Sequence, residues 1–126
     1  MLIQKKHNNQ TSPENILTKA VLRASDELGV TNAELAAVLG VSTSYVSKLR
    51  AGSSMLQLGT KTAELSTLLI RAFRSLDAIV GGDENVARSW LRNDNGALVG
   101  TPVEQMKSIS GLVATVEYLD QRRAPL

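Results

Sequence analysis

Helix start and stop signals are the feature that most constrains how this chain folds. Ser12 followed by Pro13 is typical of a helix start, because serine caps a free backbone N–H and proline is tolerated in the first turn. The apolar residues that follow recur at helical spacing as far as Leu28. Gly29 can then end the helix in a left-handed conformation. The sequence therefore predicts a helix between Ser12 and Gly29.

Two short helical segments come next, separated by very little chain. Thr31 and Glu34 form a capping-box pattern at the start of the first segment, which reaches Gly40. Ser42 predicts the start of the second segment, and Gly52 predicts its end. Gly40 suits the tight connection because glycine adopts positive φ without a Cβ clash. The pattern predicts a helix-turn-helix, with an ordinary two-helix hairpin of a bundle as the alternative.

The rest of the chain is punctuated in the same way. The longest apolar pattern covers about residues 60–80 and ends at Gly81 and Gly82. Thr101 to Glu104 indicates a second capping box with proline at the first helical position, and Gly111 precedes the last helical pattern. No segment alternates at period two for long enough to predict a strand. We therefore predict an all-α fold, a helix-turn-helix bundle followed by a small helical domain.

Composition excludes most catalytic chemistry. The chain has no cysteine, and its one histidine, His7, lies in a polar N-terminal stretch, so neither a Ser-His-Asp triad nor a His-cluster metal site is expected. Neither Gly81-Gly82 nor Asn95-Gly96 matches a phosphate-binding fingerprint. We predict that the protein is not an enzyme and has no catalytic residues, metal or cofactor. Without a signal peptide or an apolar run of about 18–20 residues, a cytoplasmic protein without membrane contact is expected.

Charge favours the N-terminal half as the part that binds nucleic acid. Residues 1–58 carry six Lys or Arg against four Asp or Glu, whereas residues 81–126 carry five against six. Residues 41–52 contain Lys48 and Arg50 and no acid. A small positive surplus therefore coincides with the predicted helix-turn-helix, as binding to phosphate requires.

The segment from Thr31 to Gly52 resembles the helix-turn-helix of the Xre/Cro-repressor family. The shared residues are Glu34-Leu35-Ala36, Gly40-Val41-Ser42, Val46-Ser47-Lys48-Leu49 and Gly52. In that family the second helix lies in the DNA major groove. The resemblance, with Val46 and Leu49 turned inward, implies a DNA-binding set of Asn32, Ser42, Thr43, Ser44, Ser47 and Lys48. Asn32 matches a family position that contacts phosphate.

The C-terminal half resembles the toxin-binding domain of the MbcA/ParS/Xre antitoxins. The matching residues are Ala87, Trp90-Leu91, Asn95, Leu98, Gly100, Pro102, Glu104, Met106, Gly111, Val116 and Leu119. The resemblance implies an antitoxin that covers the active site of a RES-domain toxin, an enzyme that depletes NAD. It also implies a dimer that binds operator DNA, represses its own operon and forms a larger complex with the toxin.

Four regions follow from this comparison: a flexible N-terminal arm (1–11), a helix-turn-helix domain (12–58), a connecting or dimerisation helix (59–82) and a toxin-binding domain (83–126). The partner-binding candidates are Val113, Val116, Tyr118, Arg122, Arg123 and Leu126. Structural roles are expected for Trp90, Pro102 and Gly111, with Trp90 as a core anchor or a partner contact. The long helix is either intrachain core or a dimer surface. The alternative function is a plain Xre-type regulator whose C-terminal half only dimerises or senses a ligand.

Overall fold

The computed structural model describes residues 11–123, and this part of the chain is all-α, as predicted. The described helices are α2 (Pro13–Leu28), α3 (Asn32–Leu39), α4 (Thr43–Ala51), α5 (Lys61–Ile79), α6 (Glu84–Arg92), α7 (Pro102–Gln105) and α8 (Ile109–Arg123). An isolated antiparallel bridge between Asn95 and Gly100 closes the loop between α6 and α7. The predicted N-terminal arm lies outside the described residues except for Thr11.

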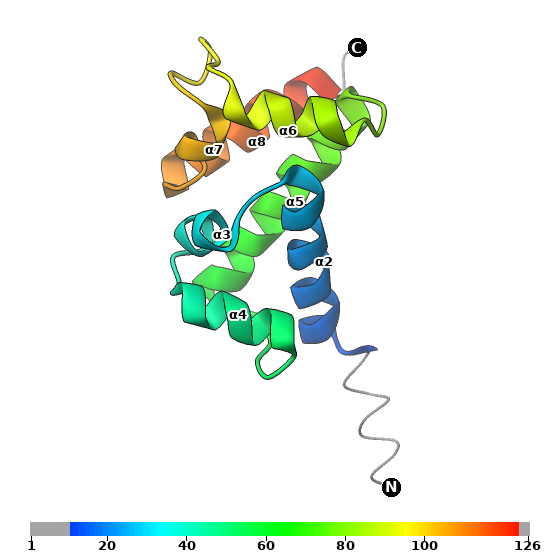
Figure 1. The fold of residues 1–126 in the computed structure, drawn as a ribbon, viewed down its shortest axis with the longest axis vertical. Coiled ribbons are helices and arrows are strands. Elements are labelled where there is room, and N and C mark those ends of the chain that lie inside the picture. The colour runs from blue at the N-terminus through cyan, green and yellow to red at the C-terminus, as the bar shows by residue number, and fades with distance from the viewer. Residues whose placement is uncertain (1–10, 124–126) are drawn as a thin grey trace, which may run out of the picture.

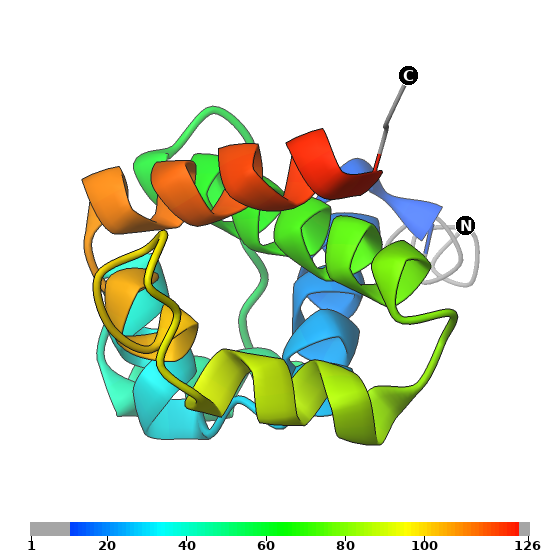
Figure 2. The ribbon, with the colours of Figure 1, turned by 90° about the horizontal axis from the view of Figure 1, so that it is seen from above.

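Helix α5 is the centre of the fold. It packs most extensively along α8 and next along α2, and it also contacts α3 and α6. Figure 2 shows α8 lying along α5, with α6 and α3 below them in that view. One continuous core therefore contains residues from both halves of the chain, from Val21 in α2 to Leu119 in α8.

The predicted capping signals of the N-terminal half are confirmed. The Ser12 hydroxyl accepts from the Asn15 N–H (3.1 Å), and Pro13 begins α2. Both bonds of the Thr31–Glu34 capping box are present, at 3.1 and 3.0 Å. Gly29, which ends α2, has the left-handed conformation predicted for it. These local bonds fix where α2 and α3 begin and end.

The C-terminal half departs from the sequence prediction at two helix starts. Thr101 makes no side-chain capping bond, and Glu104 instead forms an ion pair with Lys107 (2.7 Å). The capping box predicted there is therefore wrong, because α7 is only four residues long and its acidic side chain turns to a local cation. Helix α8 begins at Ile109, so Gly111 lies inside its first turn rather than ahead of it.

Two arginines of α6 hold the two halves together. Arg88 donates to the carbonyl oxygens of Glu27 (3.1 Å) and Asp26 (3.0 Å), and Arg92 donates to the carbonyl oxygen of Gly29 (2.7 Å). These oxygens lie at the C-terminal end of α2, where helix carbonyls lack partners and a positive charge is favoured by the helix dipole. The two side chains lie one turn apart on α6, so a single helix face provides both contacts.

The long helix is largely intrachain core. Leu69, Ala72 and Leu76 are at most 3% exposed, whereas Ile70 and Phe73 are half-buried on its flank toward α2.

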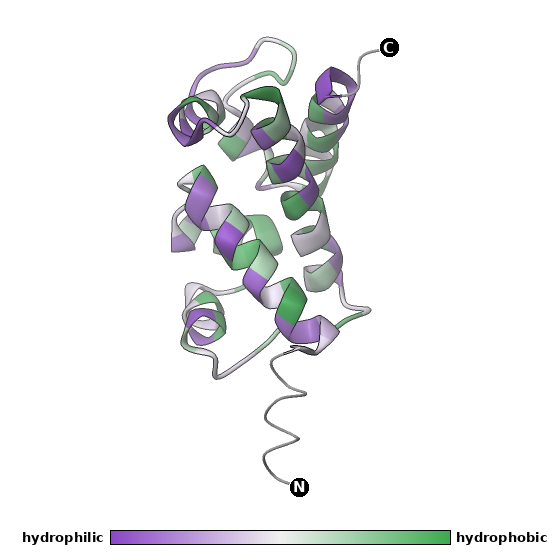
Figure 3. Cartoon of the chain, turned by 90° about the vertical axis from the view of Figure 1, so that its right-hand side faces the viewer, coloured by the Kyte–Doolittle hydropathy of each residue, from purple (hydrophilic) through white to green (hydrophobic). Residues whose placement is uncertain are grey.

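Figure 3 shows hydrophobic residues interspersed with hydrophilic ones along the outside of α2. Ile16 of α2 is 58% exposed. Within residues 11–123, no helix is both long and apolar enough to cross a membrane.

Candidate functional site

Helix α4 has a buried face and a polar face that is open to solvent. Val46 and Leu49 are at most 3% exposed and pack into the core beneath α4. Ser44, Ser47 and Lys48 are exposed. Because α4 contains no acidic residue, its outer face offers hydroxyl groups and one ammonium group to an anionic partner.

The first turn of α4 is fixed by its own cap. The Ser42 hydroxyl accepts from the Tyr45 N–H at 3.1 Å. Ser42 and Thr43 are both exposed, so this end of α4 is accessible at the surface. Half-buried Tyr45 packs against the core. All six residues predicted to bind DNA are therefore exposed, five of them from Ser42 to Lys48 and the sixth, Asn32, at the start of α3.

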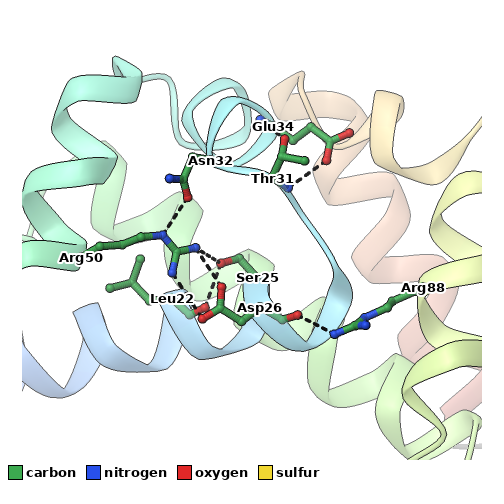
Figure 4. Close-up of polar contacts among 8 residues, drawn as sticks. All are labelled: Leu22, Ser25, Asp26, Thr31, Asn32, Glu34, Arg50 and Arg88. Carbon is green, nitrogen blue, oxygen red and sulfur yellow. Dashed lines mark hydrogen bonds and ion pairs between the residues drawn. The ribbon is translucent and has the colours of Figure 1, made fainter.

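The hydrogen bonds of Arg50 connect the C-terminal ends of α2 and α4 with the start of α3 (Figure 4). The Nε of Arg50, in the last turn of α4, donates to Oδ1 of Asn32 at 2.7 Å. Its two terminal nitrogens donate to the carboxylate of Asp26 at 2.9 and 3.3 Å. A longer contact of 3.4 Å reaches the hydroxyl of Ser25. Arg50 is thus paired within the protein, whereas the Lys48 ammonium has no ion-pair partner among residues 11–123.

The C-terminal half presents an aromatic surface between α6 and α8. The rings of Trp90 and Tyr118 stack with their centroids 6.2 Å apart, and the guanidinium of Arg122 lies 4.5 Å from the Tyr118 ring centroid. Both rings are half-buried, so Trp90 joins the edge of the core and also contributes to the surface. A shallow hollow of about 440 Å³ is lined by Asn85, Val86, Ser89, Trp90, Asn93, Asp94 and Asn95.

The predicted partner-binding residues of α8 divide between surface and core. Arg122 and Arg123 are exposed, and Val113 and Tyr118 are half-buried. Val116 is only 2% exposed, so the structure does not support it as a partner-binding residue. Its side chain lies in the core that α8 shares with α5, which leaves it no surface for a partner. Leu126 lies outside the described residues.

The glycine and proline of this half have clear structural causes. Pro102 is buried at the first position of α7. A Cβ on Gly111 would lie 1.9 Å from the carbonyl oxygen of Gln105, so α8 approaches the end of α7 too closely for any other residue. The Gly111 N–H also donates to the Ser108 hydroxyl at 3.0 Å.

One ion pair spans the two halves and was not predicted from the sequence. Arg92 binds the Glu34 carboxylate through both terminal nitrogens, with N–O distances of 2.6 and 2.7 Å. The hydrogen bond from Arg92 lowers the pKa of Glu34 to about 2; burial opposes the shift and the Thr31 N–H supports it. The same pair raises the pKa of Arg92. Only Glu34 gave a signal in the sequence, as part of the capping box.

The geometry defines a helix-turn-helix protein with a second helical surface in its C-terminal half. The antitoxin Xre-like helix-turn-helix domain matches residues 7–71, and the antitoxin Xre/MbcA/ParS C-terminal toxin-binding domain matches residues 75–124. The chain therefore belongs to the Xre-like helix-turn-helix antitoxin family and carries a toxin-binding domain of the Xre/MbcA/ParS type. No curated protein matches it in sequence. Residues 11–123 contain no cluster of three or more side chains suited to bind a metal.

Proposed function

We propose that this antitoxin blocks a RES-domain, NAD-degrading toxin through its C-terminal half and represses its own operon through α4. The observation that carries the proposal is the exposed, acid-free outer face of α4 in a chain whose residues 75–124 match a toxin-binding domain. The two surfaces lie apart, with α4 near one end of the long axis and the C-terminal end of α8 near the other (Figure 1).

The DNA-binding part of the proposal rests on α4 lying in a major groove. Its first turn, Ser42 to Ser44, would face base edges, and Lys48 would contact the phosphate backbone. Short hydroxyl side chains permit close approach but make only single hydrogen bonds to bases. Affinity would therefore depend strongly on phosphate contacts and on two copies binding together.

The toxin-binding part rests on the surface around Tyr118. Stacked aromatic rings flanked by an arginine are the residue types that contribute most energy to protein interfaces. Arg122 is held against Tyr118, so less of its rotamer freedom is lost on binding. Val113 and Arg123 would extend this surface along α8.

We infer that the dimer forms along the groove between α2 and α5. The groove, about 440 Å³, has an apolar lining that includes Ala20, Ile70 and Phe73. Its lining carries both signs of charge on each side, with Lys19, Arg23 and Glu27 on α2 and Arg74 and Asp77 on α5. Mixed charges of this kind are self-complementary under a two-fold axis, as an isologous dimer requires. Such a dimer would present two α4 helices to a near-palindromic operator.

Co-purification and DNA binding together test the proposal. The chain is co-expressed with the product of the adjacent reading frame, and the duplex upstream of its own gene is used in a mobility-shift assay. A stoichiometric complex with a RES-domain protein, and a shift of the upstream duplex, support the proposal. A shift without any protein complex favours the plain regulator. Loss of both contradicts both readings.

A further inference from the structure

The structure gives Arg50 a role that its position in α4 alone does not suggest. A basic residue in a predicted recognition helix is expected to contact DNA phosphate. Here the Arg50 side chain is only 29% exposed and extends toward α2 and α3. Its guanidinium donates hydrogen bonds to Asn32, Asp26 and Ser25.

The bond to Asn32 fixes how that carboxamide is turned. Nε of the protonated Arg50 guanidinium carries a hydrogen and can only donate. The Asn32 atom that lies 2.7 Å from it must therefore be the amide oxygen. The NH₂ group then faces away from Arg50, as Figure 4 shows. Among the described residues, nothing accepts a hydrogen bond from this NH₂ group, and Asn32 is exposed. Its two donors are therefore available to an acceptor outside the chain.

The guanidinium itself is held from the opposite side. Two nitrogens of Arg50 bind the two carboxylate oxygens of Asp26, a fork geometry that fixes the guanidinium plane. Asp26 belongs to the last turn of α2, so the orientation of Asn32 in α3 depends on a side chain of α4 that is anchored on α2.

We propose that Arg50 is a positioning residue for DNA binding, which holds the Asn32 carboxamide with its NH₂ group directed at a DNA phosphate. This inference rests on the DNA-binding function proposed above. Arg50 acts through Asn32 and makes no phosphate contact of its own. An ordered donor loses less freedom on binding than a rotating amide, so the effect is one of preorganisation.

A double-mutant cycle tests the proposal. Asn32→Ala, Arg50→Lys and the double variant are titrated with the duplex upstream of the chain's own gene over a range of salt concentrations. Arg50→Lys keeps the positive charge and removes the two-nitrogen contact with the Asp26 carboxylate. We expect Asn32→Ala to weaken binding by about 3- to 10-fold in the natural chain, as for one lost hydrogen bond. In the Arg50→Lys background the same change should cost less than about 2-fold.

Two outcomes overturn the proposal. Equal costs of Asn32→Ala in both backgrounds would show that Arg50 does not act through Asn32. A decrease of about one in the salt slope for Arg50→Ala, additive with Asn32→Ala, would show a phosphate contact by Arg50 itself. Thermal unfolding of each variant separates these results from loss of fold. Arg71→Lys is the matched control, because Arg71 also forms an ion pair, with Asp120, but lies outside α2, α3, α4 and the groove proposed for the dimer, and its side chain is 59% exposed.

A second variant keeps the test open if Arg50→Lys does not fold. Asp26→Ala removes the anchor of the guanidinium at a side chain that is 60% exposed. In that background, too, the cost of Asn32→Ala should fall, and an unchanged cost contradicts the proposal. Failure of the natural chain to bind the duplex contradicts the DNA-binding function itself. Binding that depends on Lys48 but shows no coupling contradicts only the role of Arg50.

Discussion

Arg92 of α6 and Glu34 of α3 form a bidentate ion pair whose two N–O distances are 2.6 and 2.7 Å, although 58 residues of chain separate them. The Glu34 side chain is 14% exposed, and it also accepts a hydrogen bond from the N–H of Thr31, the N-cap of α3. One carboxylate therefore caps a helix of the DNA-binding half and binds the C-terminal half. This contact makes the stability of both halves depend on the charge of one residue.

The first prediction concerns the pH dependence of unfolding. The pKa of Glu34 in the folded chain is about 2, against an ordinary value of 4.5. Its stabilising contribution is therefore complete above pH 4.5 and is lost as the pH falls toward 2. Because Arg92 is 43% exposed, we expect about 1–3 kcal/mol after allowing for solvent screening. Denaturant titrations between these pH values measure it.

Glu34→Gln isolates the charge, since glutamine can still complete a capping box. The variant should lose about 1–3 kcal/mol near neutral pH and differ little from the natural chain near pH 2. Glu64→Gln is the control, because its carboxylate is 68% exposed and lies 3.6 Å from Lys61. A difference between the natural chain and Glu34→Gln that does not shrink with falling pH contradicts this account of the ion pair.

The second prediction tests the approach of α8 to α7. Gly111→Ala places a Cβ 1.9 Å from the Gln105 carbonyl oxygen, so the helices must separate. We expect a loss of about 2–4 kcal/mol in the free energy of unfolding, as for other overpacked sites. Gly96→Ala, which meets nothing within 4 Å, should change stability by less than about 0.5 kcal/mol. Equal effects of the two substitutions contradict the packing described.

The third prediction concerns strain in the loop between α6 and α7. Val99 has φ of 57° and is 83% exposed, a conformation that costs a β-branched residue about 1–2 kcal/mol. Val99→Gly relieves the strain and adds chain entropy to the unfolded state, so stability should stay equal or rise by up to about 1 kcal/mol. Val86→Gly, also exposed but inside α6, should lose about 1 kcal/mol. A clear loss for Val99→Gly would show that the strain estimate is wrong.

Local signals in the sequence predicted most of the helices, whereas long-range contacts were not predictable. The Thr31–Glu34 box and the caps at Ser12 and Ser42 each depend on neighbours within a few residues, so spacing alone reveals them. The pairing of Arg92 with Glu34 depends on how α6 crosses α3, which no spacing encodes.

The same limit affects the candidate surfaces. Helical spacing gave the inward face of α4 because Val46 and Leu49 are its regular apolar positions. In α8 the apolar residues extend around more of the helix, so spacing could not separate buried Val116 from half-buried Val113. Likewise, Arg50 was counted from the sequence toward the positive charge of residues 41–52. Its partner Asp26 lies 24 residues earlier in the chain, so spacing could not reveal the pairing.

Contacts at the C-terminal end of α8 make deletion of this end a poor test of toxin binding. Asp120 accepts from the Ser75 hydroxyl (2.7 Å) and forms an ion pair with Arg71. Because Ser75 is fully buried, removing Asp120 would leave its hydroxyl without a partner. Deletion of residues 120–126 would therefore disturb the fold as well as the proposed toxin-binding surface. Point substitutions at Arg122 avoid this problem.

The most direct measurement is a separation of the two functions with two charge-changing variants. Ser44→Glu places a carboxylate on the outer face of α4, and Arg122→Glu reverses the charge beside Tyr118. Their controls are Ser110→Glu in the first turn of α8 and Gln121→Glu next to Arg122, both exposed positions. Each variant is assayed for binding to the upstream duplex and for protection of cells that produce the adjacent toxin.

Ser44→Glu should weaken DNA binding by at least about 10-fold through repulsion of phosphate and should still protect cells. Arg122→Glu should bind the duplex normally and protect poorly, while both controls behave as the natural chain. If Ser44→Glu binds DNA unchanged, or if Arg122→Glu protects fully, the assigned surface is wrong. If both variants lose both functions while remaining folded, the two activities share one surface, which contradicts separate surfaces for DNA and toxin.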